Sequence, residues 1–242
     1  MSARSSKLVV ALDVPSEQAA FALVDRLRDL EVIFKVGQEA LFGYGETIRR
    51  GLEERGAHAF IDAKLHDIPR TVSAGVRALV APGVDIISVH ALGGNDMMVA
   101  AVDAAAVRAS ELGIEPPKIF AVTILTSIAP EELNELGLRG GPGENVMRLA
   151  ALARDARCDG IVCSTHEVAD LKRFFGADFA TLCPGIRPAG AAHGDQKRVA
   201  TPREAVEAGA DYLVVGRPIW EAADPAEAAR AILDEMRGAD GR

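Results

Sequence analysis

Cysteine is scarce in this chain of 242 residues, which has only Cys158, Cys163 and Cys183. The three show neither a CxxC pair nor the Cys/His spacing of a metal site. The sequence therefore argues against a zinc site and against a disulfide framework. We expect reduced structural thiols in a cytoplasmic protein.

Long hydrophobic runs and basic blocks are also lacking. The apolar run at residues 8–12 ends at Asp13 and is too short for a signal segment, and no stretch approaches the length of a membrane span. The net charge is −8, and aromatic residues are not interleaved with basic ones. These absences argue against a membrane or a nucleic acid as partner. A phosphorylated small molecule remains possible, because a few local arginines suffice to hold it.

Hydrophobic residues nevertheless make up 49% of the chain and recur in short, often β-branched runs. Such runs are typical of strands buried on both faces. Stretches with helical periodicity fill the gaps, and Ser16 is a candidate N-cap for the first of them. The expected strands are 8–12, 32–36, 57–61, 84–89, 119–125, 160–163, 179–182 and 212–215, and the expected helices are 16–30, 38–55, 69–80, 96–112, 143–157, 166–175, 202–208 and 225–236.

Eight strands alternating with eight helices predict an α/β fold, a single-domain (β/α)8 TIM barrel spanning residues 1–242. A doubly wound open sheet is the alternative, but it would usually carry a glycine-rich turn after its first strand. Here that turn runs from Asp13 to Ser16 and contains no glycine. No linker divides the chain, so we expect one domain.

The stretch 62–71, which reads DAKLHDIPRT, places two carboxylates around one lysine. If the third strand continues through residue 65, alternation points Asp62 and Lys64 to the same face. Asp67 then follows in a loop, before a proline suited to the first turn of a helix. A buried row of this kind must be mutually paired, and such rows concentrate at functional sites. The alternative is a surface ion-pair cluster.

Polar residues or glycines follow nearly every expected strand, where a barrel enzyme carries its active site. This arrangement favours an enzyme over a non-catalytic nucleotide-binding barrel, in which Lys64 or a neighbouring carboxylate should have been lost. The residues at these ends are Asp13, Lys35, Asp62, Lys64, His90, Thr123, Ser127, Ser164, Arg187, Gly216 and Arg217.

The last two strands are each followed by a glycine and an arginine, in the segments 184–188 (PGIRP) and 215–219 (VGRPI). Glycine lets the backbone approach an anion closely, and arginine suits bidentate contacts to oxygen. A phosphate site is therefore expected here, although a tight turn at Gly216 with two solvated arginines is the alternative. The long loop 188–201 between them is rich in small residues and is predicted to close over the phosphate, with Gln196 as a further donor.

On these residues the chain resembles the orotidine 5′-phosphate decarboxylase family over nearly its whole length. The resemblance rests on the segments 11–13 (ALD), 34–37 (FKVG), 62–71 (DxKxxDIPxT), 88–91 (SVHA), 122–127 (VTILTS), 184–188 (PGIRP) and 215–219 (VGRPI).

The resemblance implies cofactor-independent decarboxylation of orotidine 5′-phosphate to UMP, the last step of de novo pyrimidine nucleotide biosynthesis. Lys35, Asp62, Lys64 and Asp67 would form the catalytic charged array. Lys64 would protonate C6 of the pyrimidine as carbon dioxide leaves, with Asp62 against the substrate carboxylate. His90 receives no catalytic step.

The remaining positions would bind the nucleotide. Asp13 and Lys35 would meet the ribose hydroxyls, while Thr123 and Ser127 would lie at the pyrimidine edge. Asp67 and Thr71 would enter the neighbouring subunit's site, so the resemblance implies a homodimer. The phosphate side would comprise Pro184, Arg187, Gln196, Gly216 and Arg217.

No cofactor motif or metal-ligand cluster stands out in the sequence. We therefore expect neither a cofactor nor a metal, and fixed charges must stabilise the developing carbanion. The alternative function is that of a sugar-phosphate decarboxylase, aldolase or epimerase on the same phosphate-binding barrel, which would commonly need a divalent metal.

Overall fold

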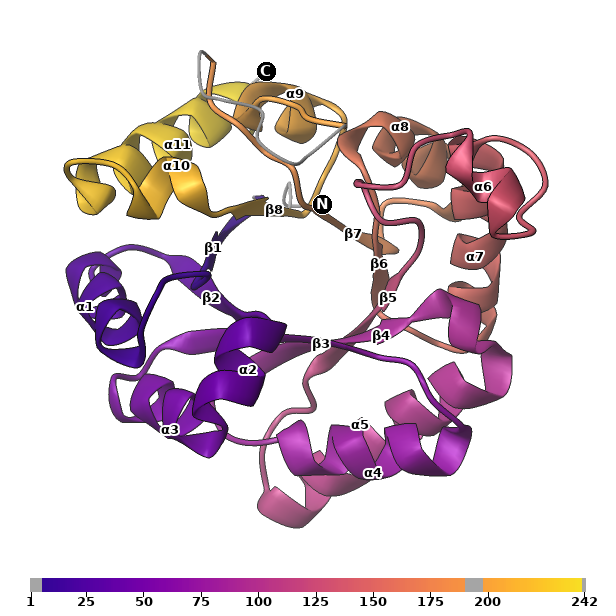
Figure 1. Cartoon of the computed structure of the whole chain (residues 1–242), viewed down its shortest axis with the longest axis horizontal. Coiled ribbons are helices and arrows are strands. Elements are labelled where there is room, and N and C mark those ends of the chain that lie inside the picture. The colour runs from indigo at the N-terminus through magenta and orange to yellow at the C-terminus, as the bar shows by residue number, and fades with distance from the viewer. Residues whose placement is uncertain (1–5, 190–197, 241–242) are drawn as a thin grey trace.

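The computed structural model describes residues 6–189 and 198–240, and in that part of the chain eight parallel strands form a closed barrel (Figure 1). Each strand pairs with its neighbours in sequence, and pairing of β1 with β8 closes the ring. This closure confirms the TIM barrel and excludes the open sheet. The strands are β1 (Lys7–Ala11), β2 (Val32–Val36), β3 (His58–Leu65), β4 (Val84–His90), β5 (Lys118–Val122), β6 (Gly160–Val162), β7 (Ala180–Cys183) and β8 (Tyr212–Val215).

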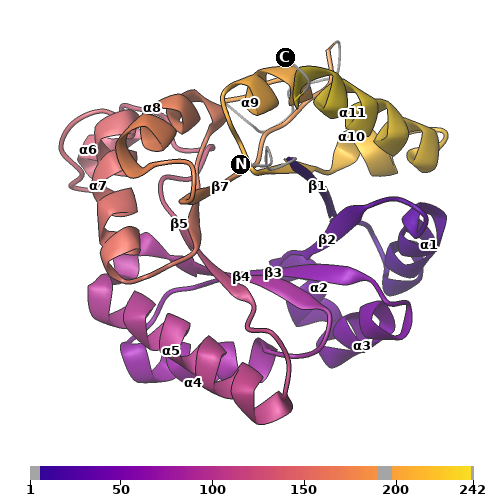
Figure 2. The ribbon, with the colours of Figure 1, turned by 180° about the vertical axis from the view of Figure 1, so that it is seen from behind.

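The helices surround the barrel, as the views from both ends show (Figures 1 and 2). Ser16 caps the first of them, because its hydroxyl accepts a hydrogen bond from the Ala19 amide at 3.1 Å. They are α1 (Glu17–Leu27), α2 (Gln38–Tyr44), α3 (Glu46–Glu54), α4 (Pro69–Leu79), the 3-10 turn η1 (Ala91–Gly93), α5 (Asn95–Leu112), α6 (Glu132–Glu135), α7 (Pro142–Asp155), α8 (Thr165–Phe175), α9 (Pro202–Glu207), α10 (Arg217–Trp220) and α11 (Pro225–Asp240).

Two details differ from the expected helices. The helix predicted over 38–55 is divided into α2 and α3 at Gly45, whose φ of +57° breaks the helical path. The short helices α6 and α10 were not predicted, since about one turn of helix has too few residues for a periodic pattern. Neither difference alters the barrel.

Apolar side chains fill two layers. Inside the barrel, Val9, Ile33, Phe60 and Phe120 belong to one buried cluster, and a larger cluster lies between the strands and the helices. Gly160 on β6 makes room for this packing, because a Cβ there would lie 2.7 Å from the Phe120 ring and 2.3 Å from the Ala180 carbonyl oxygen. The packed interior leaves the carboxyl ends of the strands as the place for a cavity.

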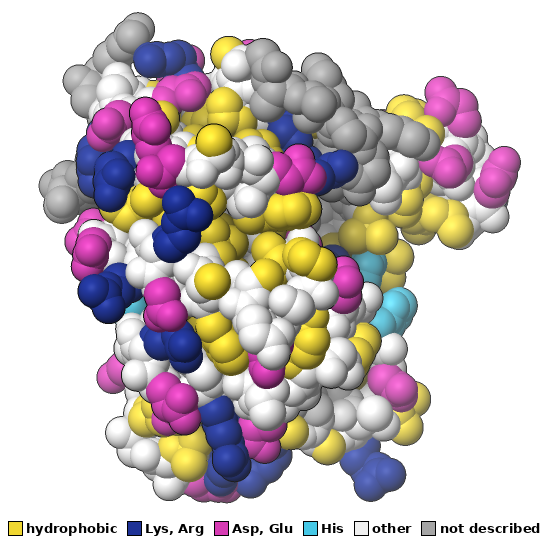
Figure 3. Space-filling view, turned by 60° about the vertical axis from the view of Figure 1, so that its left-hand side comes forward, with side chains coloured by type: hydrophobic (Ala, Val, Ile, Leu, Met, Phe, Trp, Pro, Cys, Tyr) yellow, Lys and Arg dark blue, Asp and Glu magenta, His cyan; other side chains and the backbone are white. Residues whose placement is uncertain are grey.

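The outer surface is mixed in charge. On the face seen in Figure 3, lysine and arginine side chains are interspersed with aspartate and glutamate, and no basic patch gathers there. None of the helices in the described ranges combines the length and the apolarity needed to cross a bilayer.

Candidate active site

Four charged side chains form a continuous row at the carboxyl ends of β1, β2 and β3. Lys64 Nζ lies 2.6 Å from Asp62 Oδ2, and Lys35 Nζ lies 3.8 Å from that same oxygen. Lys35 Nζ also lies 3.0 Å from Asp13 Oδ1. Two cations thus alternate with two carboxylates, as the spacing in the sequence predicted for Asp62 and Lys64.

The backbone reaches this arrangement by an irregular path. The pairing of β3 with β4 shifts register between Ile61 and Leu65, and Lys64 adopts a φ of +49°. A left-handed conformation costs a non-glycine residue roughly 1–2 kcal/mol. Side-chain alternation therefore predicted the pairing of Asp62 with Lys64 correctly, although the strand between them is locally distorted.

Ser88 on β4 holds the centre of the row. Its hydroxyl donates to Asp62 Oδ1 at 2.9 Å and accepts from the Lys64 backbone amide at 2.9 Å. Ser88 is fully buried and Asp62 is only 7% exposed, so this contact satisfies a carboxylate that water barely reaches. Ser88 has no role predicted from the sequence, although its position in the middle of an apolar strand is a signal.

A cavity of about 610 Å³ opens beside this row. Its lining includes the pyrimidine-edge candidate Ser127 and also the phosphate-side residues from the ends of β7 and β8. The predicted site residues that meet in it are Asp13, Lys35, Asp62, Lys64, Ser127, Pro184, Arg187, Gly216 and Arg217.

The phosphate side is built by a short stretch of paired backbone. The Arg187 amide donates to the Ala200 carbonyl at 2.9 Å, and the Ala200 amide donates to the Gly185 carbonyl at 3.3 Å. Gly185 has a φ of +78°, which an L side chain rarely adopts. At Gly216, a Cβ would lie 3.4 Å from the Ala11 side chain, so the backbone there passes close to β1.

Three predicted residues do not line this cavity. Asp67 and Thr71 are exposed, and Asp67 Oδ1 accepts a hydrogen bond from the Ile68 amide at 2.6 Å. Thr123 is fully buried, and its hydroxyl donates to the Val162 carbonyl at 2.8 Å. Gln196 falls outside the described residues, as do 190–197 of the loop predicted at 188–201.

Some cavity residues have no role predicted from the sequence. Thr126 lines the wall beside Ser127, three positions beyond the predicted Thr123. Trp220, the only tryptophan of the chain, contributes from the last residue of α10. A single side chain on an unpredicted helix cannot be assigned to a cavity from periodicity alone.

Cys163 also lines the cavity, but its environment does not suit a nucleophile. A hydrogen bond with Cys183, together with burial, raises the pKa of the Cys163 thiol well above its ordinary value. A thiol that stays protonated is a poor nucleophile. The described residues contain no group of three or more His, Cys, Asp or Glu side chains that could hold a metal ion.

His90 at the end of β4 lies near the row but outside the cavity lining. Burial lowers the pKa of its imidazole to about 4, and the charges of His66 and Lys64 act in the same direction. The two imidazole rings are stacked, with centroids 5.3 Å apart. A neutral, packed histidine agrees with the absence of a catalytic assignment.

Comparison with known proteins identifies the scaffold. The family model described as "Orotidine 5'-phosphate decarboxylase / HUMPS family" matches residues 6–232. The chain is 48% identical over 231 residues to the orotidine 5′-phosphate decarboxylase of Moorella thermoacetica, covering 95% of this chain and 92% of the relative. It is 43% identical over 233 residues to that of a Nostoc species, covering 96% and 98%.

Solved structures agree with the sequence matches. The crystal structure of orotidine 5′-phosphate decarboxylase from Lactobacillus acidophilus superposes with a TM-score of 0.84 at 38% identity, covering 96% of this chain and 99% of the other. That from Pyrococcus horikoshii gives a TM-score of 0.74 at 30% identity, with coverage of 96% and 99%.

Proposed function

The chain belongs to the orotidine 5′-phosphate decarboxylase / HUMPS family, and we propose that it is the carboxy-lyase that converts orotidine 5′-phosphate to UMP in pyrimidine biosynthesis. The observation that carries this proposal is that the row of Asp13, Lys35, Asp62 and Lys64 lines one cavity together with two arginines. The charged row can serve the pyrimidine and ribose while the arginines bind the phosphate. The curated relatives support the same reaction.

Lys64 is the proton donor in this proposal. Loss of the carboxylate from C6 leaves a carbanion with no adjacent carbonyl to delocalise it. An ammonium fixed where negative charge develops stabilises that charge and then transfers its proton to C6. The 2.6 Å contact with Asp62 holds the Lys64 side chain at its place in the cavity.

Asp62 and its neighbours orient the substrate. Asp62 lies against the substrate carboxylate. Repulsion between the two negative charges raises the free energy of the bound substrate, and it is relieved when the carboxylate leaves as carbon dioxide. Lys35 and Asp13, paired at 3.0 Å, present a donor and an acceptor to the ribose hydroxyls. Ser127 meets the pyrimidine edge; Thr123 remains a prediction, since its hydroxyl is bonded to Val162.

The 5′-phosphate is bound by Arg187, Gly216 and Arg217, with Pro184 shaping the same wall. Guanidinium groups match phosphate oxygens bidentately, and the glycine allows the backbone to approach. Contacts with a part of the substrate that does not react can be used to order the reacting part. Gln196 and closure by the loop 188–201 remain predictions within the same model of binding.

The working unit is a homodimer in this proposal. Asp67 and Thr71 are exposed beside Ile68, which is 62% exposed, and all three lie in or just after the loop that follows β3. Their placement outside their own cavity supports a role in the neighbouring subunit's site. The free, buried cysteines support the expected cytoplasmic location.

The test is turnover of orotidine 5′-phosphate by the purified protein, monitored through the change in ultraviolet absorbance as the substrate is consumed. Lys64→Ala should lower kcat by about a thousandfold or more, in line with the loss of a proton donor and a charge stabiliser. The variant should still bind UMP within about tenfold of the parent, because the phosphate contacts remain. Substantial residual turnover would contradict the role of Lys64.

Lys118→Ala is the matched control, because Lys118 begins β5 at the opposite end of the barrel and contacts Tyr212 there. It should turn over substrate at the parental rate. A second arm repeats the assay after chelation. A metal-dependent sugar-phosphate enzyme on this barrel would fail to process orotidine 5′-phosphate and would lose its own activity to the chelator.

A further inference from the structure

A buried ion pair lies beside the cavity without lining it. An Arg198 guanidinium nitrogen contacts a carboxylate oxygen of Glu167, and the two side chains are only 14% and 9% exposed. Neither residue belongs to the charged row or to the phosphate side. A buried pair is costly to desolvate, so it often contributes little net stability and invites another explanation.

Glu167 is fixed at the start of α8. Its second carboxylate oxygen accepts a hydrogen bond from the Ser164 amide at 2.9 Å, which completes the N-terminal cap of the helix. Burial raises the pKa of Glu167, and the positive charge of Arg198 opposes that effect. The carboxylate is therefore a rigid anchor that depends on its cationic partner.

Arg198 reaches from this anchor to the wall of the cavity. Its second terminal nitrogen donates to the Ile124 carbonyl at 3.3 Å, and residues 124–127 form the wall that includes Thr126 and Ser127. Arg198 is thus in contact with the segment that follows β5 as well as with the start of α8.

The backbone after Arg198 completes the connection. Ala200, two residues on, exchanges hydrogen bonds with Gly185 and Arg187, which lie on the phosphate side of the cavity. Arg198 therefore links the wall at 124–127, through its side chain, to the turn at 185–187, through the backbone that follows it, and Glu167 anchors its guanidinium.

We propose that Arg198 is a positioning residue, anchored by Glu167, that sets the distance between the pyrimidine-side wall and the phosphate-side turn. The inference rests on the proposed function for the identity of the substrate. A ligand that spans both parts, a nucleoside 5′-phosphate, needs this distance fixed. A nucleoside without the phosphate contacts the wall alone and needs it far less.

The first test compares two substrates. Arg198→Met should lower kcat/KM for orotidine 5′-phosphate by about 10- to 100-fold, the size of effect expected from misplaced binding groups. Most of the change should appear in KM. Turnover of orotidine, which lacks the phosphate, should change by less than about threefold. Equal losses with the two substrates, or no loss with either, would overturn the proposal.

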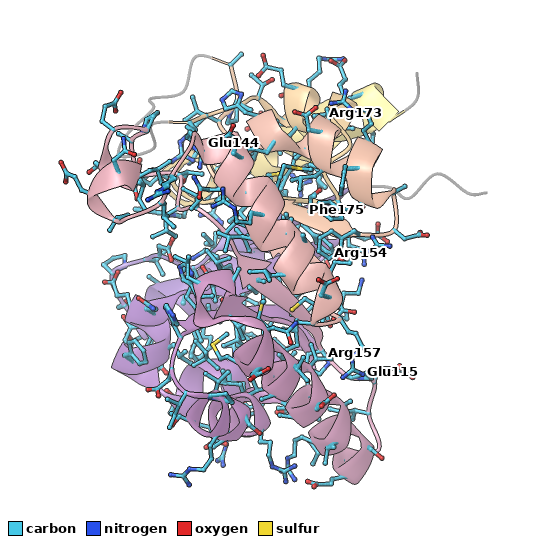
Figure 4. All side chains as sticks on the ribbon, turned by 90° about the vertical axis from the view of Figure 1, so that its right-hand side faces the viewer. Glu115, Glu144, Arg154, Arg157, Arg173 and Phe175 are labelled. Atoms are coloured by element: carbon cyan, nitrogen blue, oxygen red, sulfur yellow. The ribbon has the colours of Figure 1, made fainter. Side chains whose placement is uncertain are left out.

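The matched control is Arg154→Met. Arg154 is an exposed arginine of α7 whose guanidinium lies near the Phe175 carbonyl and over the Phe179 ring, on the outer layer of helices (Figure 4). This variant also removes an arginine that bonds to a backbone carbonyl, but at a distance from the cavity. Its kinetics with both substrates should match those of the parent.

A double variant separates positioning from stability. Removing Arg198 alone leaves Glu167 as an uncompensated buried charge, whereas Glu167→Leu with Arg198→Met replaces the pair with apolar side chains and should recover the Tm. The loss that is selective for the phosphorylated substrate should persist in the double variant. Arg198→Lys should restore part of it. Full recovery of kcat/KM along with the Tm would mean that the pair only stabilises the fold.

A binding measurement keeps this inference distinct from the reaction itself. Trp220 lines the cavity, so its fluorescence can follow the binding of UMP and of uridine. Arg198→Met should raise the Kd for UMP by about tenfold or more and change the Kd for uridine by less than about threefold. Failure of the parent to decarboxylate orotidine 5′-phosphate would refute the proposed function alone. Equal weakening of UMP and uridine would refute the positioning role alone.

Discussion

One hydroxyl group organises the centre of the charged row. Ser88 donates to the carboxylate of Asp62 and accepts from the backbone of Lys64, so it contacts both members of the closest ion pair of the row. Without this donor, Asp62 keeps its contacts with the two lysines through Oδ2 but loses the hydrogen bond that orients Oδ1. The orientation of Asp62, and with it that of the Lys64 ammonium, depends on this contact.

Ser88→Ala should therefore lower kcat for orotidine 5′-phosphate by about tenfold. A hydrogen bond to a charged group contributes roughly 1.5–3 kcal/mol, and 1.4 kcal/mol corresponds to a factor of ten. Ser6→Ala is the control, because the Ser6 hydroxyl donates to the Ala210 carbonyl at the other end of the barrel. An unchanged kcat in Ser88→Ala would show that the row does not need this hydroxyl.

His90 makes stability depend on pH. Burial lowers its pKa from 6.5 to about 4 in the folded protein. As pH falls below about 6.5, the unfolded chain takes up a proton that the folded protein refuses, so the free energy of unfolding decreases down to about pH 4 and then levels off for this group.

His90→Gln should remove that dependence. Urea unfolding measured between pH 4 and 6.5 gives the free energy of unfolding as a function of pH. The slope of this curve should be smaller in the variant than in the parent, by the amount that corresponds to about one proton. The carboxylates titrate in both proteins, so their contribution cancels when the slope of the variant is subtracted from that of the parent. Parallel curves for the parent and the variant would contradict a depressed histidine pKa.

At the scale of the elements, the strands were predicted well because each is a short apolar run buried on both sides. The strands expected at 32–36 and 212–215 coincide with β2 and β8. The division of α2 from α3 was missed, because Gly45 sits in an otherwise helical pattern. The shift in β3 near Lys64 was missed as well, since it depends on pairing with β4.

The gathering of side chains in one cavity was predictable where they follow directly from strand ends, as for Asp62, Lys64, Arg187 and Arg217. It was not predictable where a contact joins distant segments. The pair of Glu167 and Arg198 spans 31 residues of sequence, and neither side chain lies in a motif that specifies the other. Ser88 likewise meets its partners only when β3 and β4 pair.

Gly160 gives a prediction for β6 and β7. Gly160→Ala would place a Cβ 2.3 Å from the backbone oxygen of Ala180. Backbone cannot yield as a side-chain tip can, so the variant should lose about 1–3 kcal/mol of unfolding free energy. Gly143→Ala in α7 is the control, because a Cβ there meets nothing within 4 Å.

Denaturant unfolding of both variants checks this. The control should be equal to the parent or more stable by roughly 0.5–1 kcal/mol, since alanine favours a helix over glycine. A Gly160→Ala protein as stable as the parent would mean that the strands can separate at this point without cost.

At the scale of the whole molecule, the proposed homodimer would give Asp67 and Thr71 a place in the site of the neighbouring subunit. Both residues are exposed and lie outside the cavity of their own chain. In a two-fold dimer, one subunit can supply them to the other, and the exchange is reciprocal. Under this proposal, activity depends on assembly of the dimer.

Hybrid dimers test this directly. Lys64→Ala and Asp67→Ala should each be nearly inactive alone. When the two are mixed and allowed to exchange subunits, half of the dimers should be hybrids, and each hybrid has one intact site. The mixture should then regain about one quarter of the parental activity. A mixture no more active than its components would place Asp67 in the site of its own chain.

Lys64 is one of two non-glycine residues in the described chain with a left-handed backbone, at a φ of +49°. An alanine there keeps the unfavourable backbone conformation, whereas a glycine adopts it freely. Both variants lack the ammonium, yet Lys64→Gly should be more stable than Lys64→Ala by about 1 kcal/mol. Glycine at this position therefore gives the better trap for an intact Michaelis complex, in which an unreacted orotidine 5′-phosphate could be seen in place.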